Sequence, residues 1–129
     1  MANLLVVDDD PDTARALAEV LGYIGHDVRI AFDGRQGLAQ LDERLPDLVL
    51  LDVEMPVLGG PEMAERMFLH NLGLEHIPVV LISGVPHLQR VASDVGTPYA
   101  LAKPFELEKL SEVVAKALSE RIAPHPRLN

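Results

Sequence analysis

Short, uninterrupted apolar runs recur along this chain, and they constrain its fold more than any other feature. Four of them are "LLVV" at 4–7, "LVLL" at 48–51, "IPVVLI" at 77–82 and "YALA" at 99–102. Runs of this length without polar alternation are typical of strands that are covered on both faces. A fifth candidate, "DVRIAF" at 27–32, alternates more, so we expect it nearer the edge of a sheet.

Segments whose apolar residues recur every three or four positions separate these runs. The first follows Asp10, a predicted N-cap, with Pro11 in its first turn. Its apolar positions are Ala14, Leu17, Ala18, Leu21 and Ile24. The last and most regular segment contains Leu107, Leu110, Val113, Val114, Ala117, Leu118 and Ile122. Strand and helix alternate five times, which predicts an α/β fold of (βα)5 order with a doubly wound, five-stranded parallel sheet and helices on both faces.

The length of 129 residues is that of one domain. We expect residues 1–122 to form this domain. The short C-terminal tail at 123–129, "APHPRLN", contains two prolines, so we expect it to leave the last helix and fray. A tail of this length cannot hold a further folded domain, which predicts a chain that acts through protein contacts.

Charge and composition exclude several classes of function. The net charge is −9 and the eleven Lys and Arg residues are scattered, which predicts no binding to nucleic acid. The absence of cysteine excludes disulfides and thiol catalysis. No apolar run is long enough to cross a bilayer, and the N-terminus lacks the basic region of a signal peptide. We therefore expect a cytoplasmic protein without membrane contact.

Polar residues follow the four apolar runs directly. They are the carboxylates Asp8 and Asp9 after the first run, then Asp52, Ser83 and Lys103. The carboxyl ends of parallel strands share one edge of the sheet, where such folds carry their functional sites. We therefore expect these side chains to meet. Asp10 is assigned to the helix cap and left out of the site.

This set of groups has the chemistry of a magnesium and phosphate site. Hard cations prefer oxygen ligands, and a divalent cation allows mutually repelling carboxylates to stay ionised together. Lys103 is the first lysine of the sequence, and arginine serves the earlier basic positions. A compact ammonium can follow a carboxylate or a phosphoryl group, whereas guanidinium imposes planar, bidentate geometry. Together the groups suggest transfer of a phosphoryl group to a carboxylate.

The motifs in this order resemble the response regulator receiver domain of two-component signalling, in the single-domain form of the chemotaxis regulators. "LLVVDDD" resembles the family's acidic pair, "LVLLDVEMPVLGG" its phosphoacceptor strand and loop, "VVLISG" its hydroxyl switch strand and "LAKPF" its Lys-Pro signature. The resemblance covers the chain from residue 4 to the last helix. It implies the flavodoxin-like variant of the doubly wound fold.

The resemblance implies a metal site that contains the acceptor. Asp52 would be the phosphoacceptor. Asp52 and Asp9 would bind Mg²⁺ directly together with the backbone carbonyl of Glu54, and Asp8 would act through a water molecule.

It also implies roles for the groups around the phosphoryl group. Lys103 would pair with Asp52 and later with the phosphoryl oxygens, and Ser83 would donate a hydrogen bond to one of them. The peptide bond between Lys103 and Pro104 would be cis. Gly60 would let the backbone turn away after the acceptor loop.

As a whole, the resemblance implies a stand-alone phosphoacceptor and not an enzyme. It would take a phosphoryl group from a phosphohistidine of a histidine kinase or phosphotransfer protein and act on a downstream protein target. Two alternatives stay open: a pseudo-receiver that is a pure interaction module, and a phosphohydrolase working through an aspartyl phosphate. The cognate kinase, the target and the oligomeric state are not determined by the sequence.

One position departs from the family pattern. Ala100 stands where the family usually has an aromatic residue that moves with the hydroxyl group, which keeps the pseudo-receiver alternative open. Tyr99 lies one place earlier and therefore on the other face of the strand. We expect partner contacts at Tyr99 and on the exposed face of the last helix.

Overall fold

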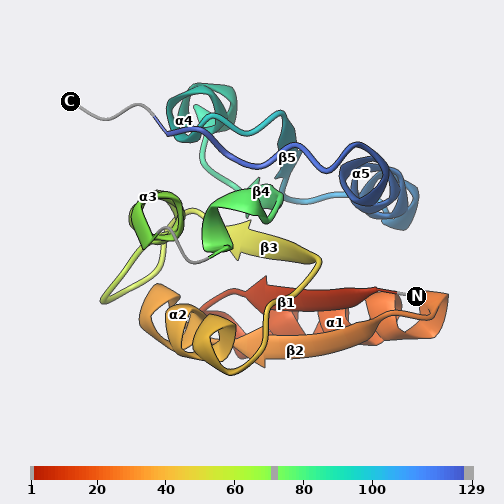
Figure 1. Ribbon diagram of the computed structural model, residues 1–129. Coiled ribbons are helices and arrows are strands. Elements are labelled where there is room, and N and C mark those ends of the chain that lie inside the picture. Colours follow the sequence, from red (N-terminus) through yellow and green to blue (C-terminus); the bar gives the residue numbers. More distant parts are fainter. Residues whose placement is uncertain (1, 71–72, 127–129) are drawn as a thin grey trace.

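The computed structural model describes residues 2–70 and 73–126 and shows a five-stranded parallel sheet between two layers of helices (Figure 1). The strand order is β2-β1-β3-β4-β5. The strands are β1 (Asn3–Val7), β2 (Asp27–Ala31), β3 (Leu48–Asp52), β4 (Val79–Ser83) and β5 (Tyr99–Ala102). The helices are α1 (Pro11–Ile24), α2 (Gly34–Glu43), α3 (Gly60–His70), α4 (Leu88–Val95) and α5 (Leu107–Glu120), with a 3-10 turn, η1 (Leu74–His76), before β4. The predicted fold class and element order are confirmed.

The side chains of β1 alternate between two separate cores. Leu4 and Val6 pack with α1 and α5, whereas Leu5 and Val7 pack with α2, α3 and α4 on the other face. Every residue of β3 and β4 is buried as well, so the central strands have no face exposed to solvent. This is why their sequences lack polar alternation. In β2 only Ala31 is buried, and the strand lies at the predicted edge.

Helix α1 begins and ends at the signals that its sequence contains. The Asp10 carboxylate accepts a hydrogen bond from the Asp12 N–H at 3.2 Å, and Pro11 is the first helical residue. Gly25, with a φ of 117°, ends the helix in the left-handed conformation that glycine adopts without strain. The outermost members of the two predicted apolar faces are about half exposed. Ile24 and Leu107 lie in terminal turns of α1 and α5, and Ile122, which was predicted on the face of the last helix, lies beyond the end of α5 at Glu120.

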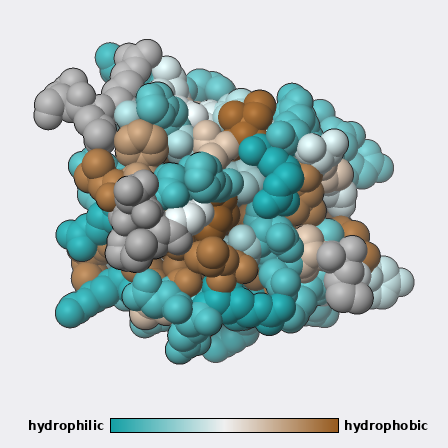
Figure 2. All heavy atoms as spheres, in the orientation of Figure 1, coloured by the Kyte–Doolittle hydropathy of each residue, from teal (hydrophilic) through white to brown (hydrophobic). Residues whose placement is uncertain are grey.

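The face of the molecule drawn in Figure 2 is largely hydrophilic, with apolar side chains gathered in a few separate patches. Within the described part of the chain, none of the helices is both long and apolar enough to span a bilayer.

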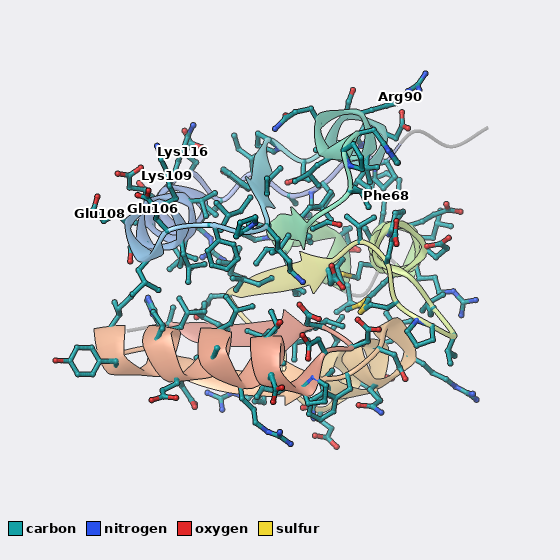
Figure 3. All side chains as sticks on the ribbon, turned by 180° about the vertical axis from the view of Figure 1, so that it is seen from behind. Phe68, Arg90, Glu106, Glu108, Lys109 and Lys116 are labelled. Atoms are coloured by element: carbon teal, nitrogen blue, oxygen red, sulfur yellow. The ribbon has the colours of Figure 1, made fainter. Side chains whose placement is uncertain are left out.

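The prediction that the tail frays is wrong for residues 123–126. The His125 N–H donates to the Gly96 carbonyl at 3.2 Å, and the His125 ring meets Phe68 edge to face with ring centroids 4.9 Å apart. Figure 3 shows Phe68 at the side of the molecule where α3 and α4 lie. The chain therefore crosses from the end of α5 to the opposite helical layer.

The two prolines of the tail explain this difference. They end the helix, as predicted, but Pro124 and Pro126 are also buried and so add apolar contacts that hold the segment in place. Residues 127–129 lie outside the described residues. The division of the chain into a domain at 1–122 and a tail stays a prediction.

Tyr99 was wrongly predicted to contact a partner. Its side chain is 1% exposed, in the core formed with α1 and α5. Its hydroxyl donates to Glu120 Oε1 at 3.0 Å and accepts from the Ile122 N–H at 3.4 Å. The cause is the alternation of β5: Ala100 faces the α2–α4 layer, which turns Tyr99 toward α5.

The exposed face of α5 stays a prediction as a partner surface. Charged side chains, among them Glu108, Lys109 and Lys116, project from its outer side (Figure 3).

We expect Gly96→Ala to lower the free energy of unfolding by about 1–2 kcal/mol. Gly96 has a φ of 78°, and an added Cβ would overlap the His125 carbonyl. Urea denaturation measures the change. In the control Gly22→Ala, where no atom lies within 4 Å of the added Cβ, we expect a small gain because alanine favours the helix. Equal stability of Gly96→Ala and the unchanged protein would contradict the tail's packing.

Candidate functional site

The carboxyl ends of four strands bring the predicted polar residues to one edge of the sheet. Asp8 follows β1, Asp52 ends β3, Ser83 ends β4 and Lys103 follows β5. These strands pair in parallel, so their ends are level. The sequence-based expectation that these side chains meet is confirmed.

Lys103 links two of the carboxylates. Its Nζ donates to Asp8 Oδ2 at 2.9 Å and lies 3.6 Å from Asp52 Oδ1. Burial lowers the pKa of Lys103, but the hydrogen bond to Asp8 and the negative charges of Asp52 and Asp8 outweigh this effect and raise it above its usual value. The lysine is therefore a fixed positive charge beside two carboxylates that are only 2% and 7% exposed.

Backbone groups hold Asp8 in this position. Asp8 Oδ1 accepts from the Asp10 N–H at 3.0 Å, and the Asp8 N–H donates to the Ala31 carbonyl at 3.1 Å. Asp10 itself caps α1 and accepts from Thr13 Oγ1 at 2.7 Å, which agrees with its exclusion from the site.

The surroundings of Asp52 disfavour the ionised form of its carboxyl group. Its pKa is raised to about 6, first by burial and next by the charge of Asp8, with a smaller contribution from Asp9. Lys103 and the Val53 N–H, which donates to Asp52 Oδ1 at 3.0 Å, oppose the rise without cancelling it. One ammonium thus does not balance the three carboxylates, and the site would be stabilised by further positive charge.

The donor set fits a hard divalent cation. Asp8, Asp9 and Asp52 each offer a ligand atom, and these atoms lie within 4.8 Å of one another. Asp9 is exposed, which leaves a side open to water. Carboxylate oxygens with water in the remaining positions are the ligands that Mg²⁺ favours. The acidic cluster is therefore of a kind that could bind a metal ion.

An open hollow of about 440 Å³ lies beside the carboxylates. It is lined by Asp52, Glu54, Ser83, Gly84, Val85, Pro86 and Lys103. Ser83 Oγ accepts from the Val85 N–H at 3.2 Å, so its own hydrogen is left to donate to another group. Glu54 is exposed at the rim of the hollow. That its backbone carbonyl binds the metal ion stays a prediction.

Two backbone features that the resemblance implied are confirmed. The peptide bond between Lys103 and Pro104 is cis. At Gly60 an added Cβ would overlap the Asp52 carbonyl, so glycine lets α3 start directly against the end of β3. Sequence reasoning missed the hydrogen bond from Val53 to Asp52 and the contribution of Pro86 to the wall of the hollow. The only local signal for them was that they adjoin the predicted site residues.

The parallel sheet in the order 2-1-3-4-5, with acidic side chains and a lysine at its carboxyl edge, defines a doubly wound α/β protein with a candidate metal site. The family model of the response regulator receiver domain matches residues 4–115. The chain belongs to this family and is a two-component response regulator receiver domain. Receiver domains partner with histidine kinases, and the family is usually a non-enzymatic phosphoacceptor.

Individual relatives agree with this assignment. The response regulator MprA of Mycolicibacterium vanbaalenii is 37% identical over 123 residues, which cover 94% of this chain and 52% of that protein. The chain thus spans about half the length of the curated relatives it matches.

Solved structures of similar size are also close. The receiver domain of NtrX from Brucella abortus has a TM-score of 0.80 and 33% identity, covering 90% of this chain and 98% of that one. The chemotaxis protein CheY4 of Vibrio cholerae has a TM-score of 0.82 and 28% identity, with the same coverage of 90% and 98%.

Asp52→Asn should stabilise the metal-free protein at neutral pH by about 1–2 kcal/mol. The pKa of Asp52 is about 6 in the folded chain against 3.8 for the ordinary group, so the folded state binds more protons between these values. The contribution of Asp52 to stability is therefore greatest below about pH 4 and is lost as the pH rises through 6. Urea denaturation at pH 4 and pH 7 measures this loss. It should be smaller in Asp52→Asn, and an equal loss in both proteins would contradict the raised pKa.

Proposed function

We propose that this chain accepts a phosphoryl group on Asp52 from a phosphohistidine of a histidine kinase or phosphotransfer protein, in a Mg²⁺-dependent reaction, and then signals by contact with another protein. The observation that supports it most directly is the position of Lys103 Nζ between Asp8 and Asp52. A buried acceptor flanked by one fixed cation and by carboxylates that can hold another is equipped for phosphoryl transfer.

Asp52 acts as the nucleophile. Its hydrogen bond from Val53 and its contact with Lys103 both involve Oδ1, so we assign the attack on phosphorus to Oδ2. The new bond joins Oδ2 to phosphorus while the bond from phosphorus to the histidine nitrogen breaks. The imidazole leaves with that electron pair as a neutral ring when its other nitrogen carries a proton. The product is an aspartyl phosphate, a mixed anhydride that water later hydrolyses.

Charge compensation is the main contribution of the surrounding residues. Asp52 must be ionised to attack, and its pKa of about 6 leaves it largely ionised at neutral pH. Lys103 neutralises part of the charge on the transferring group, and Ser83 donates its hydroxyl hydrogen to a phosphoryl oxygen. Mg²⁺, held by Asp8, Asp9, Asp52 and the Glu54 carbonyl, would neutralise charge on the phosphoryl oxygens.

The route from the site to a signalling surface differs from the family pattern. Ala100 packs against the α2–α4 core and supplies no aromatic ring, and Tyr99 faces the other core. We therefore assign the response to the hydroxyl of Ser83 and the start of α4, the helix that follows it, without a moving aromatic side chain.

The phosphoacceptor role is tested by intact mass after incubation with acetyl phosphate. We expect a gain of one phosphoryl group that requires Mg²⁺ and is absent in Asp52→Asn. No gain from acetyl phosphate or from a phosphorylated histidine kinase, in folded protein, would refute the proposal and favour a pure interaction module. Gain that persists in Asp52→Asn would place the acceptor elsewhere.

Lys103→Arg tests the need for a compact positive charge. Guanidinium keeps the charge but imposes planar, bidentate geometry, so we expect the rate of phosphorylation by acetyl phosphate to fall about tenfold or more. Lys109→Arg is the matched control on the exposed outer side of α5 and should leave the rate unchanged. Equal rates in both variants would show that charge alone suffices at Lys103.

A further inference from the structure

The loop between β3 and α3 contains a strained turn at Val57. Val57 has a φ of 70°, and the Leu58 N–H donates to the Pro56 carbonyl at 2.7 Å, which closes a γ-turn around Val57. A positive φ is an outlier for a β-branched residue. The Val57 side chain is 74% exposed, so its own burial does not compensate for the strain.

Strain of this kind persists only where the surrounding structure holds the backbone in place. Two hydrogen bonds do so here. At the base of the loop, the Gly60 N–H donates to the Val53 carbonyl at 2.9 Å; at its tip, the Gly34 N–H donates to the Leu58 carbonyl at 3.0 Å. Figure 1 shows the loop reaching from the end of β3 toward the start of α2.

The contact at the tip requires glycine. Gly34 is the first residue of α2, where the N–H groups of a helix have no partner within the helix. A Cβ added to Gly34 would overlap the Leu58 carbonyl oxygen, so the close approach depends on the missing side chain. Asp33 fixes this helix end, because its Oδ1 accepts from the Gln36 N–H at 2.8 Å.

The same loop borders the functional site. It leaves Asp52 directly, and Glu54 on the loop lines the hollow beside Asp52 and Lys103. The tip of the loop is held by Gly34, which lies outside both the lining of the hollow and the carboxylate cluster.

We infer that Gly34 is a positioning residue for the metal site: its contact with Leu58 holds the β3–α3 loop, and with it Glu54, beside the carboxylates of Asp8, Asp9 and Asp52. This inference rests on the proposed function, because it concerns the Mg²⁺ site of that proposal. It assigns to the start of α2 a part in metal binding.

The test is a titration of the metal-free chain with Mg²⁺, in which the amide NMR signals report metal binding. In Gly34→Ala the displaced loop should raise the dissociation constant for Mg²⁺ about tenfold. This is the lower end of the effect that substitutions of residues supporting a metal ligand have on metal affinity. The amide signals of Glu54 and Leu58 should shift even before metal is added. Gly22→Ala, which adds the same methyl group to a helix where no atom lies within 4 Å, should change the constant less than about twofold.

A second pair of variants keeps the test decisive if Gly34→Ala does not fold. Asp33→Ala removes the cap that fixes the start of α2, whereas Asp33→Asn removes the same charge but keeps a capping oxygen. We expect weaker Mg²⁺ binding in Asp33→Ala than in Asp33→Asn.

The outcomes separate this inference from the proposed function. No response of the unchanged protein to Mg²⁺ would overturn the metal site and this inference together. Mg²⁺ binding by the unchanged protein, with the same affinity in Gly34→Ala or, should that variant not fold, in both Asp33 variants, would overturn this inference alone. Weaker binding confined to Gly34→Ala and Asp33→Ala would support it.

Discussion

Lys103 and Asp8 are 95 positions apart in the chain, and the hydrogen bond between them joins the last strand to the first at the edge of the sheet. This contact, together with Asp52 on β3, one of the two strands between them, sets the charge balance on which the site depends. Two buried carboxylates and one more nearby are matched by a single ammonium, and the pKa of Asp52 is raised first by burial and then by the negative charge of Asp8. A bound metal ion would therefore offset the excess negative charge of the site.

The two cores explain how the protein can carry such a site without losing its fold. Because β3 and β4 are buried along their whole length, their ends are held by side chains on both faces of the sheet. Asp52 and Ser83 are the last residues of these strands, so the packing of the strands also fixes their positions. The loops that follow these strands are not part of the sheet, and one of them contains the strained backbone turn at Val57.

Much of the fold and of the site could be predicted from the sequence, because both depend on local patterns. The run at 4–7 has no polar position since β1 is covered on both faces, and the residues after each run reach the same edge because the strands are parallel. Contacts across the molecule leave no such signal. Tyr99 belongs to an apolar run and is buried, but its hydroxyl is satisfied by Glu120, 21 positions later. In the same way, nothing near Gly34 indicates that Leu58 lies against it.

The path of the segment after α5 has a practical consequence. Pro126 lines a small hollow with Pro61 of α3 and Val91 of α4, so the polypeptide at this point is beside those helices and not at the end of α5. An affinity tag, a fluorophore or a fusion partner attached beyond Pro126 would therefore be tethered next to the helices that follow Asp52 and Ser83. A label placed there would report on that side of the domain, and a bulky one would hinder access to it.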